Sequence, residues 1–325
     1  MRNLFLIFII SISFVVSTFA QDFKIYPLKS SIAEETFQTA IVSEALVALG
    51  YKVEPINEVA YAVAFKTIAQ NSNSNDVYFI ANYWKPLHDN MFNEAGGVDK
   101  IYYENSYVEN SAQGYLIDKK SAQKYNIKYI NDLKDPKIAK IFDTNGDGKA
   151  NLSGCNPGWG CEAVIEHQLD AFKLRDNITH DQGEYSAIIA QTISRYEQGK
   201  PILYYTWTPY WVSGRLVPGK DVVWLQVTHS AHPTTKSTKL PNGADYGFNV
   251  NSQHIAANKS VLKNHPDIAK LFSIMRLHVN DISAQNMLIA KGEKKQSDFL
   301  RHAKAWIKAN QATFDSWIKE AKAAK

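Results

Sequence analysis

Short strand-like runs alternate with helical segments along this chain. The runs are rich in aromatic and β-branched residues and lie at residues 23–27, 53–56 and 77–80. Between the first two runs, the segment from Ser31 to Leu49 has apolar residues three or four positions apart, with Glu34 and Glu35 near its start as in the first turn of a helix. This alternation predicts an α/β fold in which helices pack on sheets.

The last part of the chain has a helical period. From Ser297 to Ala324, large apolar residues recur at about every third or fourth position. The segment predicts one long amphipathic helix or two shorter ones, with Trp306 and Trp317 on the buried face. We therefore expect both tryptophans to pack in the core and not to contact a ligand.

The N-terminus has the pattern of an export signal. Arg2 precedes an apolar run at residues 4–16, and small residues follow at Thr18 and Ala20. We expect a signal peptide at residues 1–20, because the run is short for a membrane span; a retained membrane anchor is the alternative. No cysteine follows the expected cut, so a soluble product in a bacterial periplasm is expected.

The charge of the chain is nearly balanced. Its 325 residues include 36 Lys and Arg against 32 Asp and Glu, a net charge of +4 that becomes +3 when Arg2 leaves with the signal. Charges of both signs are interspersed, without the long basic tract that follows a phosphate backbone, so nucleic acid is not an expected partner. A chain of this length is expected to divide into two domains.

Two segments predict where the chain passes between those domains. Residues 113–117, in AQGYLID, and residues 242–249, in NGADYGFN, both combine glycine with strand-forming residues. Two strand-like crossings would make a hinge. The predicted division is one lobe from residues 21–113 plus 247–325 and a second lobe from residues 114–246.

The chain has two cysteines, Cys155 and Cys161, in the segment GCNPGWGC. In an oxidising compartment a pair this close in sequence is expected to form a disulfide, with two free thiols as the alternative. The closed loop is short, so the bond is expected to shape a loop more than to stabilise the fold.

Three tryptophans stand in polar or glycine-rich surroundings where a core position is less natural: Trp84 in NYWKPLHDN, Trp159 inside the cysteine loop, and Trp207 in YYTWTPYW. Each could follow the carboxyl end of a strand, where open α/β sheets bind ligands. Aromatic faces attract a quaternary ammonium, which cannot donate N–H hydrogen bonds. The three residues therefore predict an aromatic box for a methylated cation, and packing in a core or between lobes is the alternative.

The residues directly after Trp159 could bind an anionic group. A helix-like run begins near Cys161, so the backbone N–H groups of Gly160 and Cys161 would lie free at a helix N-terminus. His88, four residues after Trp84, could add a side-chain hydrogen bond from the other lobe, although a histidine that caps a turn is the alternative. Together these residues predict a site for a small zwitterion.

Several segments carry a family resemblance, namely WKPLHDN, AQGYLIDKK, LKDPKIAKIFDTNGDGKANLSGCNPGWGCE, YYTWTPYWV, PGKDVVWLQV and LPNGADYGF. They closely resemble the periplasmic glycine betaine/proline betaine-binding proteins of bacterial osmoprotectant ABC importers, over nearly the whole mature chain. The resemblance implies a two-lobed periplasmic binding protein fold of the type II kind, with a hinge of crossing strands, that closes over its ligand.

The same resemblance implies roles for individual residues. The betaine cage falls on Trp84, Trp159 and Trp207. The carboxylate site falls on His88 and on the amides of Gly160 and Cys161, and the family's disulfide falls on Cys155 and Cys161. The implied ligand is glycine betaine or a related betaine. The implied partners are the membrane permease and ATPase subunits of an ABC importer, and the protein is expected to be a monomer.

Two other functions compete with this interpretation. An exported enzyme could use Cys161 as nucleophile with His167 or His88, but a bridged cysteine has no thiolate, and the chain has no GxSxG, HExxH or Walker sequence. We expect no catalytic residue and no cofactor.

A calcium-binding protein is the other competitor, because DTNGDGKAN from Asp143 to Asn151 matches the opening of an EF-hand loop. Its twelfth position is Gly154 and not a glutamate, so an Asx-rich turn without metal is the preferred interpretation.

Overall fold

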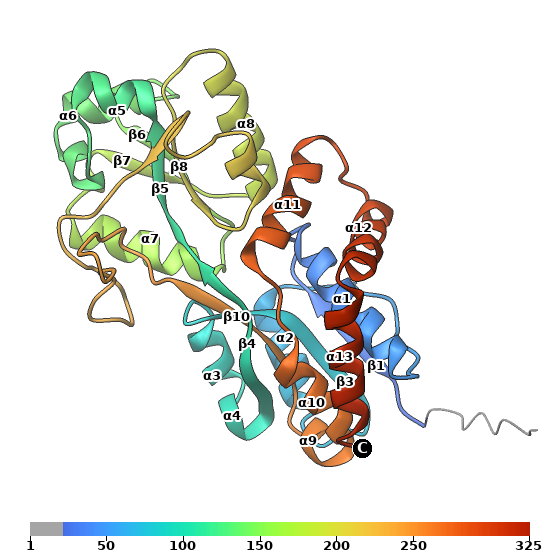
Figure 1. The fold of residues 1–325 in the computed structure, drawn as a ribbon. Coiled ribbons are helices and arrows are strands. Elements are labelled where there is room, and N and C mark those ends of the chain that lie inside the picture. The colour runs from blue at the N-terminus through green and yellow to red at the C-terminus, as the bar shows by residue number, and fades with distance from the viewer. Residues whose placement is uncertain (1–21) are drawn as a thin grey trace, which may run out of the picture.

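The computed structural model of the protein describes residues 22–325, and the expected signal peptide at residues 1–20 lies outside the described residues. The described chain builds two five-stranded sheets, each with helices around it, so the α/β expectation is confirmed. Figure 1 shows the sheets in two separate lobes that are joined by extended segments. In residues 22–325 no helix has both the length and the apolar character needed to cross a membrane.

The first sheet has the strand order β2-β1-β3-β10-β4. Its strands are β1 (Ile25–Lys29), β2 (Asn57–Glu58), β3 (Val77–Lys85), β4 (Ile101–Ser111) and β10 (Asn251–Asn258). β1 is parallel to β2 and β3, whereas β10 is antiparallel to both β3 and β4. The late strand β10 thus lies between strands from the first third of the chain.

Helices from both ends of the chain accompany this sheet. They are α1 (Glu35–Ala48), α2 (Tyr61–Gln70), α3 (Asp89–Glu94), α4 (Gly97–Lys100), α9 (Val261–Asn264), α10 (Pro266–Ile274), α11 (Val279–Ala290), α12 (Gln296–Ala309) and α13 (Gln311–Lys322). α12 and α13 pack against α1 and α10. The C-terminal segment therefore forms two helices, one of the two predicted arrangements.

The second sheet has the order β7-β6-β8-β5-β9. Its strands are β5 (Gln113–Asp118), β6 (Ala150–Ser153), β7 (Ile178–Asp181), β8 (Leu203–Trp207) and β9 (Val222–Trp224). The associated helices are α5 (Lys119–Tyr125), η1 (Ile130–Lys134), α6 (Pro136–Ala139), η2 (Lys140–Phe142), α7 (Gly160–Ala171), α8 (Tyr185–Glu197) and η3 (Trp211–Gly214). β6 is parallel to β7 and β8, and β5 is antiparallel to β8 and β9.

The chain passes from the first sheet to the second within one residue, since β4 ends at Ser111 and β5 begins at Gln113. It returns at β10, which starts at Asn251. Figure 1 shows β4 continuing into β5 beside the returning segment. The exact residues at which the lobes were predicted to divide, 113 and 246, stay predictions.

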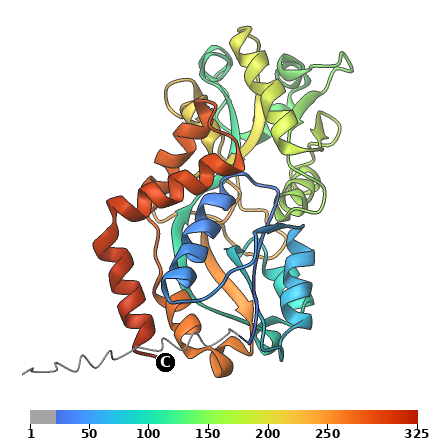
Figure 2. The ribbon, with the colours of Figure 1, turned by 90° about the vertical axis from the view of Figure 1, so that its right-hand side faces the viewer.

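A further contact between the lobes lies away from these crossings. Helix α11, from the C-terminal part of the chain, packs against η3 of the second lobe. The approach is close, because a Cβ placed on Gly214 would lie 2.3 Å from Sδ of Met287. Figure 2 shows α11 and α12 reaching from the lower lobe toward the upper one.

Burial divides the molecule into two apolar clusters. One lies between the first sheet and helices α1, α10 and α13, and includes Phe79 and Phe272. The other begins on the opposite side of the same sheet, where it includes Phe65 and Trp84, and continues through the whole second lobe. Alternate residues of β3 serve both clusters, Phe79 in the first and Ile80 in the second, as expected for a strand with two covered faces.

Two predicted elements are displaced in the structure. The run at residues 53–56 does not form a strand of its own: Val53 makes an isolated bridge to Ile25, and β2 follows at Asn57–Glu58. The first helix begins at Glu35, not Ser31, because the Glu35 carboxylate turns back to the backbone N–H and Oγ of Ser30. Hydrophobic pattern alone does not register such side-chain hydrogen bonds.

The C-terminal helices supply a test of core packing. Trp317 is 6% exposed and its ring stacks on that of half-buried Trp306, with centroids 6.0 Å apart. The variant Trp317→Ala should lose about 3 kcal/mol or more of unfolding free energy, because a large ring leaves a cavity. Guanidinium denaturation followed by circular dichroism measures this loss. Leu300→Ala, at a position 39% exposed, is the control and should change little; equal losses in both variants would contradict a core role for Trp317.

Candidate functional site

A pocket lies between the two lobes and contains every candidate ligand-binding residue. Its lining consists of Ile32, Tyr61, Trp84, Leu87, His88, Gln113, Trp159, Gly160, Cys161, Tyr205 and Trp207. The space among them, with the open solvent at its mouth included, is about 310 Å³. None of these lining residues has a carboxylate, ammonium or guanidinium group, so a charged ligand there would meet rings, amides and one imidazole.

Strand ends place two of the three tryptophans. Trp84 is the penultimate residue of β3, and Trp207 is the last residue of β8. Trp159 comes after β6, where it is the residue that caps α7. Because β6 and β8 are parallel neighbours, their carboxyl ends lie together and bring Trp159 and Trp207 within 5.9 Å between ring centroids, nearly edge to face.

The second lobe surrounds its two tryptophans with further rings. Tyr185 packs on Trp207 with centroids 4.8 Å apart, and Tyr210 packs on it at 4.2 Å. The hydroxyl of Tyr185 donates to the carbonyl of Tyr205 at 2.8 Å. Trp84 and Trp207 are 5% and 4% exposed, so the alternative of buried packing also holds for them: they belong to the core and line the pocket at once.

His88 lies in the turn after β3, with its ring 4.0 Å from that of Tyr61 between centroids. Its Nδ1 accepts the backbone N–H of Trp84 at 3.4 Å, which makes it a turn-capping histidine. Burial lowers the pKa of His88 to about 3, so the ring is neutral at neutral pH. With Nδ1 an acceptor, the proton is on Nε2, and the ring keeps one donor for a ligand.

The N-terminus of α7 faces the first lobe. Gly160 and Cys161 are its first two residues, and N–H groups at that position have no acceptor within the helix. A Cβ on Gly160 would lie 2.7 Å from both Cγ and the carbonyl oxygen of Leu87. Glycine is therefore required for the close approach of α7 to the turn that holds His88.

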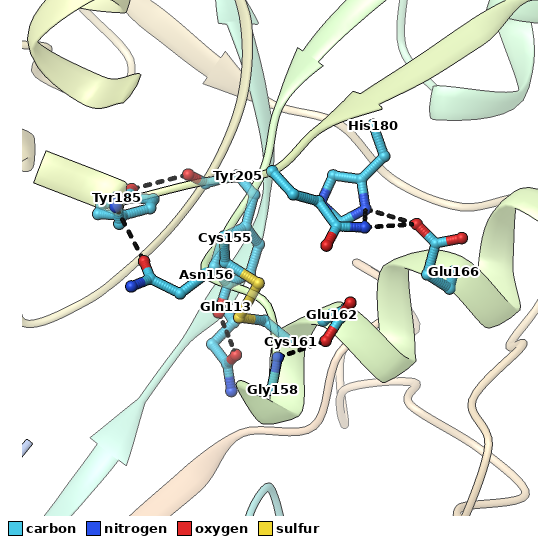
Figure 3. The surroundings of a disulfide bond; sticks show 11 residues. Gln113, Cys155, Asn156, Gly158, Cys161, Glu162, Glu166, His180, Tyr185 and Tyr205 are labelled. Atoms are coloured by element: carbon cyan, nitrogen blue, oxygen red, sulfur yellow. Dashed lines mark hydrogen bonds and ion pairs between the residues drawn. A yellow bond between two sulfur atoms is a disulfide. The ribbon is translucent and has the colours of Figure 1, made fainter. Parts of the chain in front are cut away.

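The disulfide between Cys155 and Cys161 is present, and it joins the end of β6 to the first turn of α7. Figure 3 shows the loop between them, where the N–H of Gly158 donates to Glu162 and Asn156 accepts the N–H of Tyr185 at 2.8 Å. The bond thus fixes the segment that carries Trp159, in line with the predicted loop-shaping role, and it removes the thiolate that an enzyme would need.

Several pocket residues were not predicted from the sequence: Ile32, Tyr61, Leu87, Gln113 and Tyr205. Glu35 was not predicted either; its carboxylate lies behind the wall and accepts Nε1–H of Trp84 at 3.2 Å. Gln113 and Tyr205 are joined by a hydrogen bond from the tyrosine hydroxyl. No local pattern marks these residues, because each is ordinary for its own strand, helix or turn and reaches the pocket only through the tertiary fold.

The segment from Asp143 to Asn151 forms the expected Asx-rich turn. Asp143 Oδ1 accepts the N–H of Gly146 at 2.7 Å, and Oδ2 accepts that of Gly148 at 2.8 Å. These backbone donors lower the pKa of the Asp143 carboxyl. Within residues 22–325 no cluster of three or more His, Cys, Asp or Glu side chains is arranged to hold a metal ion.

A crevice between two α/β lobes, joined by crossing segments, defines a two-lobed solute-binding protein. Residues 28–309 match the family model OpuAC, the substrate binding domain of ABC-type glycine betaine transport systems, and the chain belongs to this family. The protein is thus a substrate-binding component of transport and not an enzyme.

Curated relatives agree with this assignment. The chain is 56% identical over 314 residues to the glycine betaine/proline betaine-binding periplasmic protein of Escherichia coli (strain K12), covering 94% of each chain. It is 54% identical over 316 residues to the protein of the same description in Salmonella typhimurium, covering 95% of this chain and 94% of that one. The expected periplasmic location is confirmed by these relatives.

Solved structures share the fold at low sequence identity. One is a lactococcal family member in its closed conformation complexed with glycine betaine, with a TM-score of 0.68, 20% identity, and 91% of this chain and 100% of that chain covered. Another is a glycine betaine, L-proline transporter binding protein from Borrelia burgdorferi, with a TM-score of 0.71, 17% identity, and 93% and 100% covered. The predicted two-lobed binding protein fold is confirmed.

The buried, neutral state of His88 predicts a pH dependence. Its pKa falls from an ordinary 6.5 to about 3 on folding, so its contribution to stability is complete above pH 6.5 and is lost as pH falls toward 3. Between pH 6.5 and 5, the unfolding free energy of the ligand-free protein should fall relative to His88→Gln by up to about 1.4 kcal/mol per pH unit. Urea denaturation of both proteins measures the difference, and parallel pH profiles would contradict a neutral His88.

Proposed function

We propose that this protein binds glycine betaine in the pocket between its lobes. The observation that carries the proposal is the pocket wall itself: three tryptophans from both lobes, N–H donors at Gly160, Cys161 and His88, and no charged side chain. A zwitterion with a methylated cation and a carboxylate fits such a wall.

The trimethylammonium group is assigned to Trp84, Trp159 and Trp207. A quaternary nitrogen has no N–H to donate, so a carboxylate lining would add little direction, whereas ring faces attract the diffuse positive charge of its methyl groups. The nearly perpendicular arrangement of Trp159 and Trp207 gives the cation two walls from one lobe, and Trp84 would supply a third from the other.

The carboxylate of the ligand is assigned to the N–H groups of Gly160 and Cys161 and to Nε2–H of His88. Two consecutive amides at the start of α7 point along the helix axis toward an anion, and the helix dipole has the favourable sign there. A neutral imidazole donates to a carboxylate without adding a charge that would repel the ammonium group.

Binding is proposed to hold the lobes together. Trp84 and His88 belong to the lobe at residues 21–113 plus 247–325, while Trp159, Gly160, Cys161 and Trp207 belong to the lobe at residues 114–246. A ligand that contacts both sets favours the closed state by its differential affinity for that state.

The partners proposed for the closed protein are the permease and ATPase subunits of an ABC importer, to which it delivers the betaine as a monomer. The support is the family description, which places such domains in ABC-type transport systems, and the relatives' description as periplasmic betaine-binding proteins.

Titration of the mature protein with glycine betaine tests this function. Calorimetry should give one site per chain, and Trp159→Ala should weaken binding by about 1 to 2 kcal/mol, through loss of a cation–π wall. Trp306→Ala, at a half-buried tryptophan outside the pocket, is the matched control and should leave the affinity unchanged. Absence of betaine heat from folded protein would refute the proposal.

Two other ligands test the cation site and the carboxylate site individually in the same experiment. Choline retains the trimethylammonium group but lacks the carboxylate, and proline retains the carboxylate but lacks the methylated cation. Both should bind more weakly than glycine betaine, and equal affinity of choline and betaine would contradict the assigned carboxylate site.

A further inference from the structure

A buried acid lies directly behind the pocket wall. Glu35 is 1% exposed and does not line the pocket, but its Oε1 accepts Nε1–H of Trp84 at 3.2 Å and the hydroxyl hydrogen of Tyr61. Both Trp84 and Tyr61 line the pocket. One carboxylate oxygen therefore connects two side chains of the wall from its far side.

The other oxygen of Glu35 is also occupied by donors. Oε2 accepts the backbone N–H of Ser30 at 3.0 Å and its hydroxyl hydrogen at 2.7 Å. Indole and amide N–H groups can only donate, so the arrangement of four donors around two oxygens suits the ionised carboxylate. Burial raises the pKa of Glu35, and the hydrogen bonds from Tyr61, Ser30 and Trp84 oppose this rise.

The neighbouring charged groups do not neutralise this carboxylate by direct contact. Lys29 directs its ammonium group to the carbonyl of Ser30 at 2.6 Å and to Glu58 at 2.7 Å. The adjacent acid, Glu34, accepts the backbone N–H of Trp211 at 3.4 Å, and burial raises its pKa to about 8. Of the two adjacent acids, Glu35 is thus the one whose carboxylate oxygens have four hydrogen-bond donors, an arrangement that suits the ionised form.

A negative charge in this place acts on the cage in two ways. A carboxylate on the indole N–H makes the ring face of Trp84 more electron-rich, which strengthens its attraction for a cation. In the dry, low-dielectric wall the charge also attracts a cation in the pocket directly, since little water screens it. Neither effect acts on an uncharged head group of the same shape.

We propose that Glu35 determines specificity for charge: from behind the wall, it makes the pocket prefer a cationic head over a neutral head of equal size. This proposal rests on the proposed betaine site. Glu35 is a positioning and specificity residue, because it touches the cage and not the ligand.

The test compares two ligands of nearly the same shape. The first is glycine betaine, and the second is 3,3-dimethylbutanoate, in which a tert-butyl group replaces the trimethylammonium group. Calorimetry gives both dissociation constants for the wild type and for Glu35→Gln, which removes the charge at constant size. The preference for betaine should fall about tenfold in Glu35→Gln, mainly through weaker betaine binding, equivalent to about 1.4 kcal/mol.

Loss of charge alone leaves binding of 3,3-dimethylbutanoate nearly unchanged, whereas a purely structural role for Glu35 predicts a different result: a misplaced Trp84 would clearly weaken binding of the neutral analogue as well. That result would overturn the proposal. Glu35→Asp keeps the charge and should keep most of the preference; it also replaces Glu35→Gln if that variant does not fold, and loss of the preference in Glu35→Asp would then refute the role of charge.

Asp267→Asn is the matched control. Asp267 is a buried acid of the same lobe that accepts the hydroxyl hydrogen of Tyr51 at 2.6 Å and does not contact the pocket wall. The Asp267→Asn variant should retain the wild-type ratio of the two dissociation constants. Failure of the betaine site itself would show differently, as a wild type that does not prefer betaine over its neutral analogue.

Discussion

The close approach of Gly160 to Leu87 is the constraint on which the pocket depends. At this point the first turn of α7 meets the turn after β3 with no room for a side chain, since a Cβ would lie 2.7 Å from a backbone oxygen. Only this approach brings the free N–H groups of α7 within the same small space as His88. The two halves of the site are built on different sheets, so contact between backbones, and not the length of a side chain, sets the width of the pocket.

Each half of the site is held by a different device. In the second lobe the disulfide and the packed rings of Tyr185 and Tyr210 hold Trp159 and Trp207. In the first lobe a hydrogen bond holds Trp84, because its indole N–H donates to the carboxylate of Glu35. A buried polar network of this kind is stabilising only when every member has a partner, and the four donors around Glu35 meet that condition.

Features of the fold that depend on local sequence patterns could be predicted, whereas features that depend on tertiary contacts could not. The α/β class, the helix before Leu49 and the paired C-terminal helices depend on local periodicity, and they were predicted, the C-terminal pair as one of two alternatives. The gathering of the six candidate residues around one pocket was anticipated from strand ends and from a family resemblance. The hydrogen-bond network of Glu35 behind Trp84 was not anticipated. Glu35 has the local pattern of a solvent-facing acid in a first helical turn, and only the tertiary fold buries it.

The apolar cluster that runs from Phe65 and Trp84 through the whole second lobe has a consequence for the empty protein. Moving the lobes apart would expose part of that cluster to water. The open state therefore has a higher free energy from hydration of apolar surface, and this term does not depend on any ligand. Since the hydrophobic driving force weakens on cooling, the balance between open and closed forms should itself depend on temperature. In a cold environment the vacant protein would spend more of its time open and ready to admit a solute.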